Sequence, residues 1–182
     1  MSVIRDPKLE RLLSTLHARS DAQAEELKNF EAQRAKGGPQ SGEQAIKDFR
    51  SDKLVALDRD KAEFCYQLCR ASDARRVVEI GTSYGVSTLY LAAAVRDNVR
   101  AGGGQGMVIG SEYEPAKARA ARANFERAGL SRFIDLREGD LRETLKHIEG
   151  PVDFMLVDIW ITMARPVRYC DGTYSAQART KC

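Results

Sequence analysis

The sequence has no apolar run that approaches the length of a membrane-spanning helix, although 43% of its 182 residues are hydrophobic. Residues 1–11 lack the apolar core of a secretory signal peptide, and the four cysteines follow no spacing typical of a metal or redox site. A net charge of +3 is too small to indicate a nucleic-acid partner. We therefore expect a cytoplasmic protein with reduced thiols that binds neither membranes nor nucleic acid.

Histidine is also scarce, with two residues in the chain, and this leaves few candidates for a general base. His17 lies in a predicted N-terminal helix. His147 falls in the last turn of another predicted helix, where the helix dipole favours a positive side chain. The sequence therefore identifies no general base.

What the sequence does contain is a short β-branched run, residues 76–80, which leads into a glycine turn and then into apolar residues at helical spacing. Such a run predicts a strand that is buried on both faces. Gly81 and Gly85 allow backbone conformations, and a close approach of ligand, that a Cβ would obstruct. The helix that follows presents free N–H groups and the positive end of its dipole, so the turn favours an anionic or polar ligand.

Two common glycine motifs do not fit this turn. A phosphate-binding loop needs four residues between its glycines and a Lys after the second, whereas Gly81 and Gly85 enclose three residues and no Lys follows. A dinucleotide fingerprint needs glycine where this chain has Ser83. A dehydrogenase is therefore disfavoured.

Further strands are predicted at 107–111, 133–137 and 152–158, with helices between them. This alternation predicts an α/β fold: a doubly wound parallel sheet of about four strands with right-handed crossovers and a ligand at the carboxyl ends of the strands. Helices precede the sheet, one over residues 7–36 and another that opens with a capping box at Asp60 and Glu63. The predicted units are a peripheral helical arm (1–42), an incomplete α/β domain (43–165) and an irregular tail (166–182).

Acidic residues stand at the ends of the later strands. Glu112 ends the second strand and is placed to accept hydrogen bonds from ribose hydroxyls. Taken alone, it is better explained as a solvated strand end, and its combination with the glycine turn is what favours a ligand. Asp140 follows the third strand and, with Glu143 three residues later, is also predicted as a helix N-cap. Asp158 ends the fourth strand.

These features together resemble the first motif of class I methyltransferases that use S-adenosylmethionine, E-x-G-x-x-x-G-x-S, here Glu79, Gly81, Gly85 and Ser87. Asp158-Ile159-Trp160 resembles the D-x-W of catechol-type O-methyltransferases, a branch that includes the caffeoyl-CoA enzymes. The resemblance covers roughly residues 43–165. It implies a Rossmann-like fold and transfer of a methyl group from S-adenosylmethionine to an oxygen of a small-molecule acceptor.

The resemblance also implies roles for individual residues. Glu112 would bind ribose, Asp140 and Trp160 would meet adenine, and Asp158 would face the reacting centre as the one catalytic candidate. The family completes a metal site at this Asp with an Asp-Asn pair on the next strand, which this sequence lacks, so no metal site is predicted. The cofactor-binding residues implied are Glu79, Gly81, Thr82, Ser83, Gly85, Ser87, Glu112, Tyr113, Gly139, Asp140, Asp158 and Trp160.

A complete member of that family has seven strands in the order 3-2-1-4-5-7-6, and the sequence predicts four. Residues after Pro166 show neither helical nor strand periodicity. This loss of pattern suggests a C-terminally truncated or frame-shifted version of a longer methyltransferase. Two hypotheses for its function follow: an active O-methyltransferase, or a catalytically inactive fragment that at most binds the cofactor. The fourth strand is expected to leave an exposed apolar edge, which favours aggregation or pairing with another chain, and the arm is interpreted as a cover or a dimer contact, so a homodimer is one expected assembly.

Overall fold

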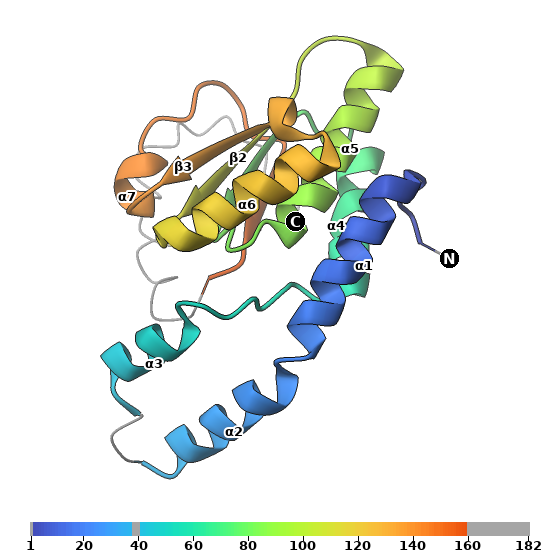
Figure 1. Ribbon diagram of the computed structural model, residues 1–182. Coiled ribbons are helices and arrows are strands. Elements are labelled where there is room, and N and C mark those ends of the chain that lie inside the picture. The colour runs from blue at the N-terminus through green and yellow to red at the C-terminus, as the bar shows by residue number, and fades with distance from the viewer. Residues whose placement is uncertain (1, 38–40, 160–182) are drawn as a thin grey trace.

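The computed structural model describes residues 2–37 and 41–159. Its N-terminal part is helical, and alternating strands and helices follow (Figure 1). The elements are α1 (Pro7–Asp21), α2 (Ala24–Ala35), α3 (Glu43–Arg50), α4 (Arg59–Ala71), β1 (Arg76–Ile80), α5 (Val86–Gly102), β2 (Met107–Glu112), α6 (Pro115–Ala128), the 3-10 helix η2 (Ser131–Phe133), β3 (Ile134–Glu138), α7 (Leu141–Thr144) and β4 (Phe154–Val157). None of the helices in these ranges is both long enough and apolar enough to cross a membrane.

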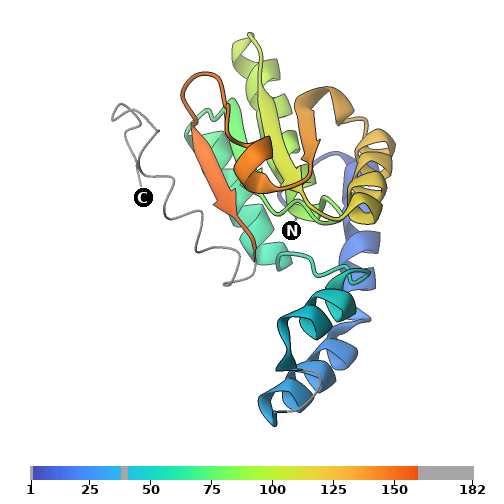
Figure 2. The same cartoon turned by 90° about the vertical axis from the view of Figure 1, so that its left-hand side faces the viewer.

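The described strands form one parallel sheet in the order β3-β2-β1-β4, which confirms the predicted α/β fold (Figure 2). β1 lies between β2 and β4, and its last residue, Ile80, pairs with Ser111 on one side and Val157 on the other. α5 and α6 connect strands that step in one direction across the sheet, and the connection from β3 to β4 returns in the other. The order therefore reverses beside β1, and ligands of such sheets bind at the carboxyl ends of the strands at this point.

The hydrophobic core lies where α5 packs on β1 and β2. Leu89 and Leu91 of α5 are fully buried, as are Val77 and Val108 of the two strands. Leu9 and other apolar residues of α1 belong to the same core, and α1 contacts both α5 and α6. The predicted division at residue 42 therefore does not separate α1 from the core of the α/β part.

Two predicted helix boundaries were wrong because contacts with distant residues decide them. The helix expected over 7–36 is interrupted at Ala22 and Gln23, where the Gln23 amide donates to the Leu54 carbonyl (3.0 Å) and accepts from the Leu54 N–H (3.2 Å). The N-cap of α4 is Asp58, and Asp60 lies in its first turn. The segment around Leu54 forms neither helix nor strand and joins α3 to α4, so the helix begins where this segment ends.

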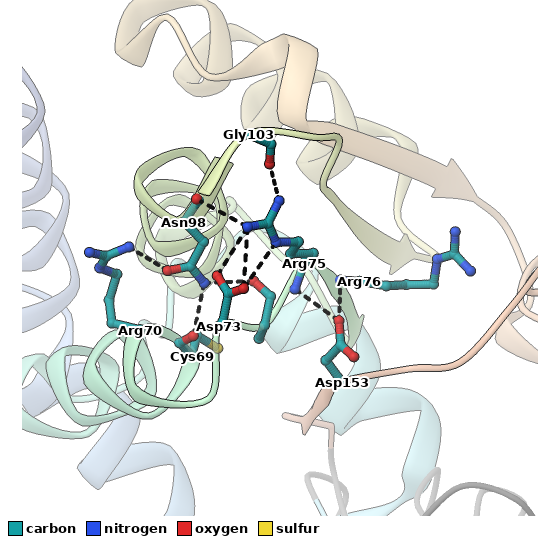
Figure 3. Close-up of polar contacts among 9 residues, drawn as sticks. Cys69, Arg70, Asp73, Arg75, Arg76, Asn98, Gly103 and Asp153 are labelled. Atoms are coloured by element: carbon teal, nitrogen blue, oxygen red, sulfur yellow. Dashed lines mark hydrogen bonds and ion pairs between the residues drawn. The ribbon is translucent and has the colours of Figure 1, made fainter. Parts of the chain in front are cut away.

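Polar contacts connect β1 to its neighbours at the N-terminal ends of the strands (Figure 3). The Asp153 carboxylate, just before β4, accepts hydrogen bonds from the backbone N–H groups of Arg75 (2.9 Å) and Arg76 (2.8 Å) at the start of β1. Asn98 of α5 donates to the Cys69 carbonyl of α4 (2.9 Å). These contacts join β1, β4, α4 and α5 far from the glycine turn.

Replacing Asp153 with Ala should lower the free energy of unfolding by about 2 kcal/mol, because two backbone donors lose a charged acceptor. Urea denaturation followed by circular dichroism measures this change. Glu126→Ala is the control, since Glu126 is exposed on α6, and it should change stability by less than about 0.5 kcal/mol. Equal stabilities for the two variants would contradict the role given to Asp153.

Candidate functional site

Glu79, the fourth residue of β1, is fully buried at the centre of the site. Its Oε1 accepts a hydrogen bond from the Ser87 hydroxyl (2.6 Å), and its Oε2 accepts from the hydroxyls of Thr82 (2.9 Å) and Thr88. Burial raises the pKa of Glu79 to about 7, against the lowering effect of the three hydroxyls. With no exposed surface, this carboxyl group does not face a ligand; it joins β1 to the first turn of α5.

The glycine turn between β1 and α5 takes left-handed backbone conformations, with φ values of 95° at Gly81, 51° at Ser83 and 81° at Gly85. A Cβ on Gly81 would lie 2.3 Å from the backbone oxygen of Asp158, and one on Gly85 would lie 2.4 Å from the Phe125 ring. Glycine is therefore required at both positions by neighbouring protein, whereas the sequence suggested close approach of a ligand.

The end of β2 holds this turn in place through Glu112, which is 8% exposed. One carboxylate oxygen accepts from the Ser83 N–H (2.6 Å) and the other from the Glu114 N–H (2.7 Å). The Gly139 N–H, after β3, donates to the Glu112 carbonyl (2.9 Å). A carboxylate has about four acceptor positions, so Glu112 can still accept hydrogen bonds from a ligand.

The N-terminus of α5 follows the turn that Glu112 holds, and its first residues, Val86 and Ser87, are 4% and 5% exposed. The first intrahelical hydrogen bond is donated by Leu89 to the Gly85 carbonyl (3.0 Å). The N–H groups of Val86, Ser87 and Thr88 have no backbone acceptor among the described residues. Together with the helix dipole, these donors favour a carboxylate or phosphate group of a ligand.

A small pocket adjoins the turn, and residues 54–57 form one of its walls. They belong to a stretch without helix or strand, residues 52–57, which we call the covering segment. Two contacts from the α/β part hold this region: the Tyr84 hydroxyl donates to the Asp52 carbonyl (2.8 Å), and the Lys117 ammonium donates to the Arg50 carbonyl (2.9 Å). Burial lowers the pKa of Lys117. The pocket is lined by Leu54, Val55, Ala56, Leu57, Gly81, Thr82, Ser83, Tyr84, Val86, Ser87 and Asp158.

Asp158 follows β4 and lines this pocket. Its N–H donates to the Ile80 carbonyl (2.9 Å), which fixes the end of β4 beside the end of β1. Burial raises the pKa of the Asp158 carboxyl, and Lys61 opposes this shift. Across residues 2–37 and 41–159, no three His, Cys, Asp or Glu side chains form a group that could hold a metal ion.

The structure brings most of the implied cofactor residues to one edge of the sheet, but not all of them into the pocket. Tyr113 is 49% exposed, with the Lys47 ammonium 4.6 Å from its ring centroid. Asp140 caps α7 as predicted, and both of its oxygens also contact the Arg142 guanidinium, which lowers the pKa of Asp140 to about 2. Trp160 lies outside the described residues.

Thr88 and the covering segment are the parts of this region that the sequence did not reveal. A glutamate inside an apolar strand requires hydrogen-bond donors, and this requirement was the one signal that could have pointed to Thr88. The covering segment had no such signal, because its position depends on Gln23, Tyr84 and Lys117, which lie far from it in the sequence.

The buried Glu79 should make stability depend on pH. Between about pH 4.5, the ordinary value, and pH 7, the folded protein retains a proton on Glu79 that the unfolded chain releases. Raising the pH through this range should therefore lower the free energy of unfolding by about 3 kcal/mol in total. Denaturation of wild type and Glu79→Gln at several pH values isolates this effect, because Gln does not titrate, and a constant difference between the two proteins would contradict it.

Gly85→Ala should destabilise the protein more than Gly129→Ala. Both positions have positive φ, 81° and 67°, so both variants incur a left-handed cost of roughly 1–2 kcal/mol. Only the Cβ at position 85 meets other atoms, those of the Phe125 ring at 2.4 Å and the Ala121 Cβ at 3.3 Å, and the overlap with the ring should cost about 1–3 kcal/mol more. Guanidinium denaturation midpoints compare the two variants, and partial rescue of Gly85→Ala by Phe125→Leu would identify the overlapping ring.

Comparisons with known proteins agree with this geometry. A family model described as a methyltransferase domain matches residues 78–175. A catechol O-methyltransferase from Mycobacterium tuberculosis is 37% identical over 105 residues, which are 57% of this chain and 44% of that protein. The chain spans less than half the length of the curated relatives reported first.

Two solved structures share the fold. A cofactor-bound protein from MTB superposes with a TM-score of 0.60 at 28% identity, over 88% of this chain and 58% of its own. The O-methyltransferase TomG from Streptomyces achromogenes, in complex with SAM, gives a TM-score of 0.55 at 26% identity, over 70% of this chain and 55% of its own. Since the family model covers more than half of the chain, this protein belongs to the methyltransferase domain family.

Proposed function

We propose that this protein transfers a methyl group from S-adenosylmethionine to an oxygen of a small-molecule acceptor. The observation that carries the proposal is the position of two groups at the carboxyl edge of the sheet: the free amides of α5 and the Glu112 carboxylate. Membership of a methyltransferase family and the printed activities of the relatives, which include a catechol O-methyltransferase, support it.

The chemistry of the site fits this cofactor. The amides at the N-terminus of α5 suit the carboxylate of the methionine portion. The acceptor positions left on Glu112 suit ribose hydroxyls, which are hydrogen-bond donors. When bound, S-adenosylmethionine supplies an electrophilic methyl group. The protein's task is then to hold the two reactants in line, and positioning of this kind accounts for much of the rate of a two-substrate reaction.

Asp158 and the covering segment have separate roles in this proposal. Asp158 lines the pocket at the end of β4. The small molecule that receives the methyl group loses a proton from its hydroxyl group, and the raised pKa of Asp158 makes its carboxylate a better base for that proton. Residues 54–57 of the covering segment line the same pocket. Cytoplasmic location and a homodimer remain predictions from the sequence.

Calorimetric titration with S-adenosylhomocysteine tests the cofactor site. Glu112→Gln removes the negative charge and one acceptor oxygen, so it should weaken binding by about tenfold, the effect of losing one charged hydrogen bond. Glu138→Gln is the matched control, because Glu138 ends the neighbouring strand β3 and its carboxylate pairs with Arg122 at the surface. Absence of binding to folded wild-type protein would overturn the proposal.

Turnover requires a separate assay with S-adenosylmethionine and catechol, in which formation of S-adenosylhomocysteine is measured. Binding that Glu112→Gln weakens, without turnover of catechol or other hydroxylated aromatic compounds, would favour the alternative of a cofactor-binding domain that lacks catalysis. Turnover that Asp158→Asn reduces, with unchanged affinity for S-adenosylhomocysteine, would support the proton-accepting role.

A further inference from the structure

A second pocket lies near the C-terminus of α5, and the proposed reaction does not use it. It is a groove of about 920 Å³ between the N-terminal segment, α4 and α5, where Figure 1 shows the start of α1 beside these helices. Its volume is within the range of small-molecule sites. The charged residues that line it are Arg5, Asp6, Arg70, Arg96, Asp97 and Arg100.

The two carboxylates of this groove are already engaged by the protein. Asp6 caps α1 through the N–H groups of its first turn and accepts from Nη1 of Arg96 (3.2 Å). Asp97 accepts from Nε of Arg96 (2.9 Å) and from the Tyr66 hydroxyl (2.9 Å). Arg96 is 7% exposed. These contacts neutralise Arg96, which is the buried member of the cluster, whereas the side chains of Asp6 and Asp97 are 34% and 25% exposed.

The other three arginines of the groove keep most of their donors. Arg5 makes no hydrogen bond or ion pair with any residue that the structure describes. The Arg100 side chain is 64% exposed, and its nearest carboxylate oxygen, on Asp97, is 3.9 Å away. Arg70 uses one nitrogen, which donates to the Asn98 side-chain oxygen. A guanidinium group has five N–H donors, and paired donors of this geometry match the oxygens of a phosphate group.

Arg70 and Arg100 also stand in the last turns of α4 and α5, where a positive charge offsets the helix dipole. That role does not explain why Arg5, which precedes α1, lines the same groove. Four guanidinium groups and two carboxylates give the groove a net charge of +2, which suits a doubly charged anion. The concave shape and the convergence of three separate segments favour a small molecule over an extended surface contact.

We propose that this groove binds a small phosphorylated molecule whose phosphate group is held by Arg5, Arg70 and Arg100. The groove and the glycine turn lie at opposite ends of α5, roughly 20 Å apart along the helix axis. The proposed phosphate site is therefore distinct from the proposed methyl-transfer site. Because it does not rest on methyl transfer, it can be tested in protein that fails to bind S-adenosylhomocysteine.

Calorimetric titration of the full chain with inorganic pyrophosphate tests the proposal, at low ionic strength and again at about 150 mM salt. Wild-type protein should bind, and Arg5→Gln combined with Arg100→Gln should weaken binding by about tenfold or more, the equivalent of one charged hydrogen bond. The control combines Arg11→Gln with Arg119→Gln. It removes the same charge from exposed positions on α1 and α6 and should change affinity by less than about twofold.

Two results would overturn the proposal. One is the absence of pyrophosphate binding to folded wild-type protein at low ionic strength. The other is an equal loss of affinity in the two double variants, which would mean that pyrophosphate responds to overall charge and not to this groove. Urea denaturation of the variants checks folding, and both should unfold as wild type does because the replaced side chains are exposed.

Discussion

The geometry of the glycine turn depends on one buried carboxyl group, that of Glu79. A carboxyl group inside a parallel sheet is costly unless hydrogen-bond donors surround it. The hydroxyls of Thr82, Ser87 and Thr88 supply these donors, and all three lie on the turn or on the first turn of α5. The same interaction therefore sets both the path of the turn and the direction in which α5 leaves the sheet.

Contacts from neighbouring elements also fix the glycine turn. Gly81 lies against the backbone at the end of β4, Gly85 lies against Phe125 of α6, and the Ser83 N–H is held by Glu112 at the end of β2. The ends of three adjacent strands thus meet around the turn. The unpaired amides of α5 open at this point, so a site for a polar ligand results from the same contacts that stabilise the sheet.

The two ends of α5 have different chemistry, and the N-terminal helices contribute to both. At its start, the first residues of α5 and Asp158 line a pocket together with the covering segment. Ser20 of α1 and Gln23, between α1 and α2, hold this segment by hydrogen bonds. At its end, arginines from three segments surround a groove. α1 is therefore more than an external arm: it packs into the core, and Arg5 and Asp6 just before it line the groove.

Local sequence was sufficient for the alternation of strands and helices from β1 onward, the need for glycine in the turn and the acidic residues at the strand ends. Those features depend on hydrophobic periodicity and on backbone preferences, which act over a few residues. Tertiary contacts were needed to show that Ser87 binds Glu79, that Gln23 interrupts the first predicted helix, and that residues 52–57 cover the pocket. The contacts of Gln23 and of residues 52–57 join segments distant in the chain, and no local pattern encodes such a partner. Ser87 is eight residues from Glu79, and its contact depends on the path that the glycine turn takes between them.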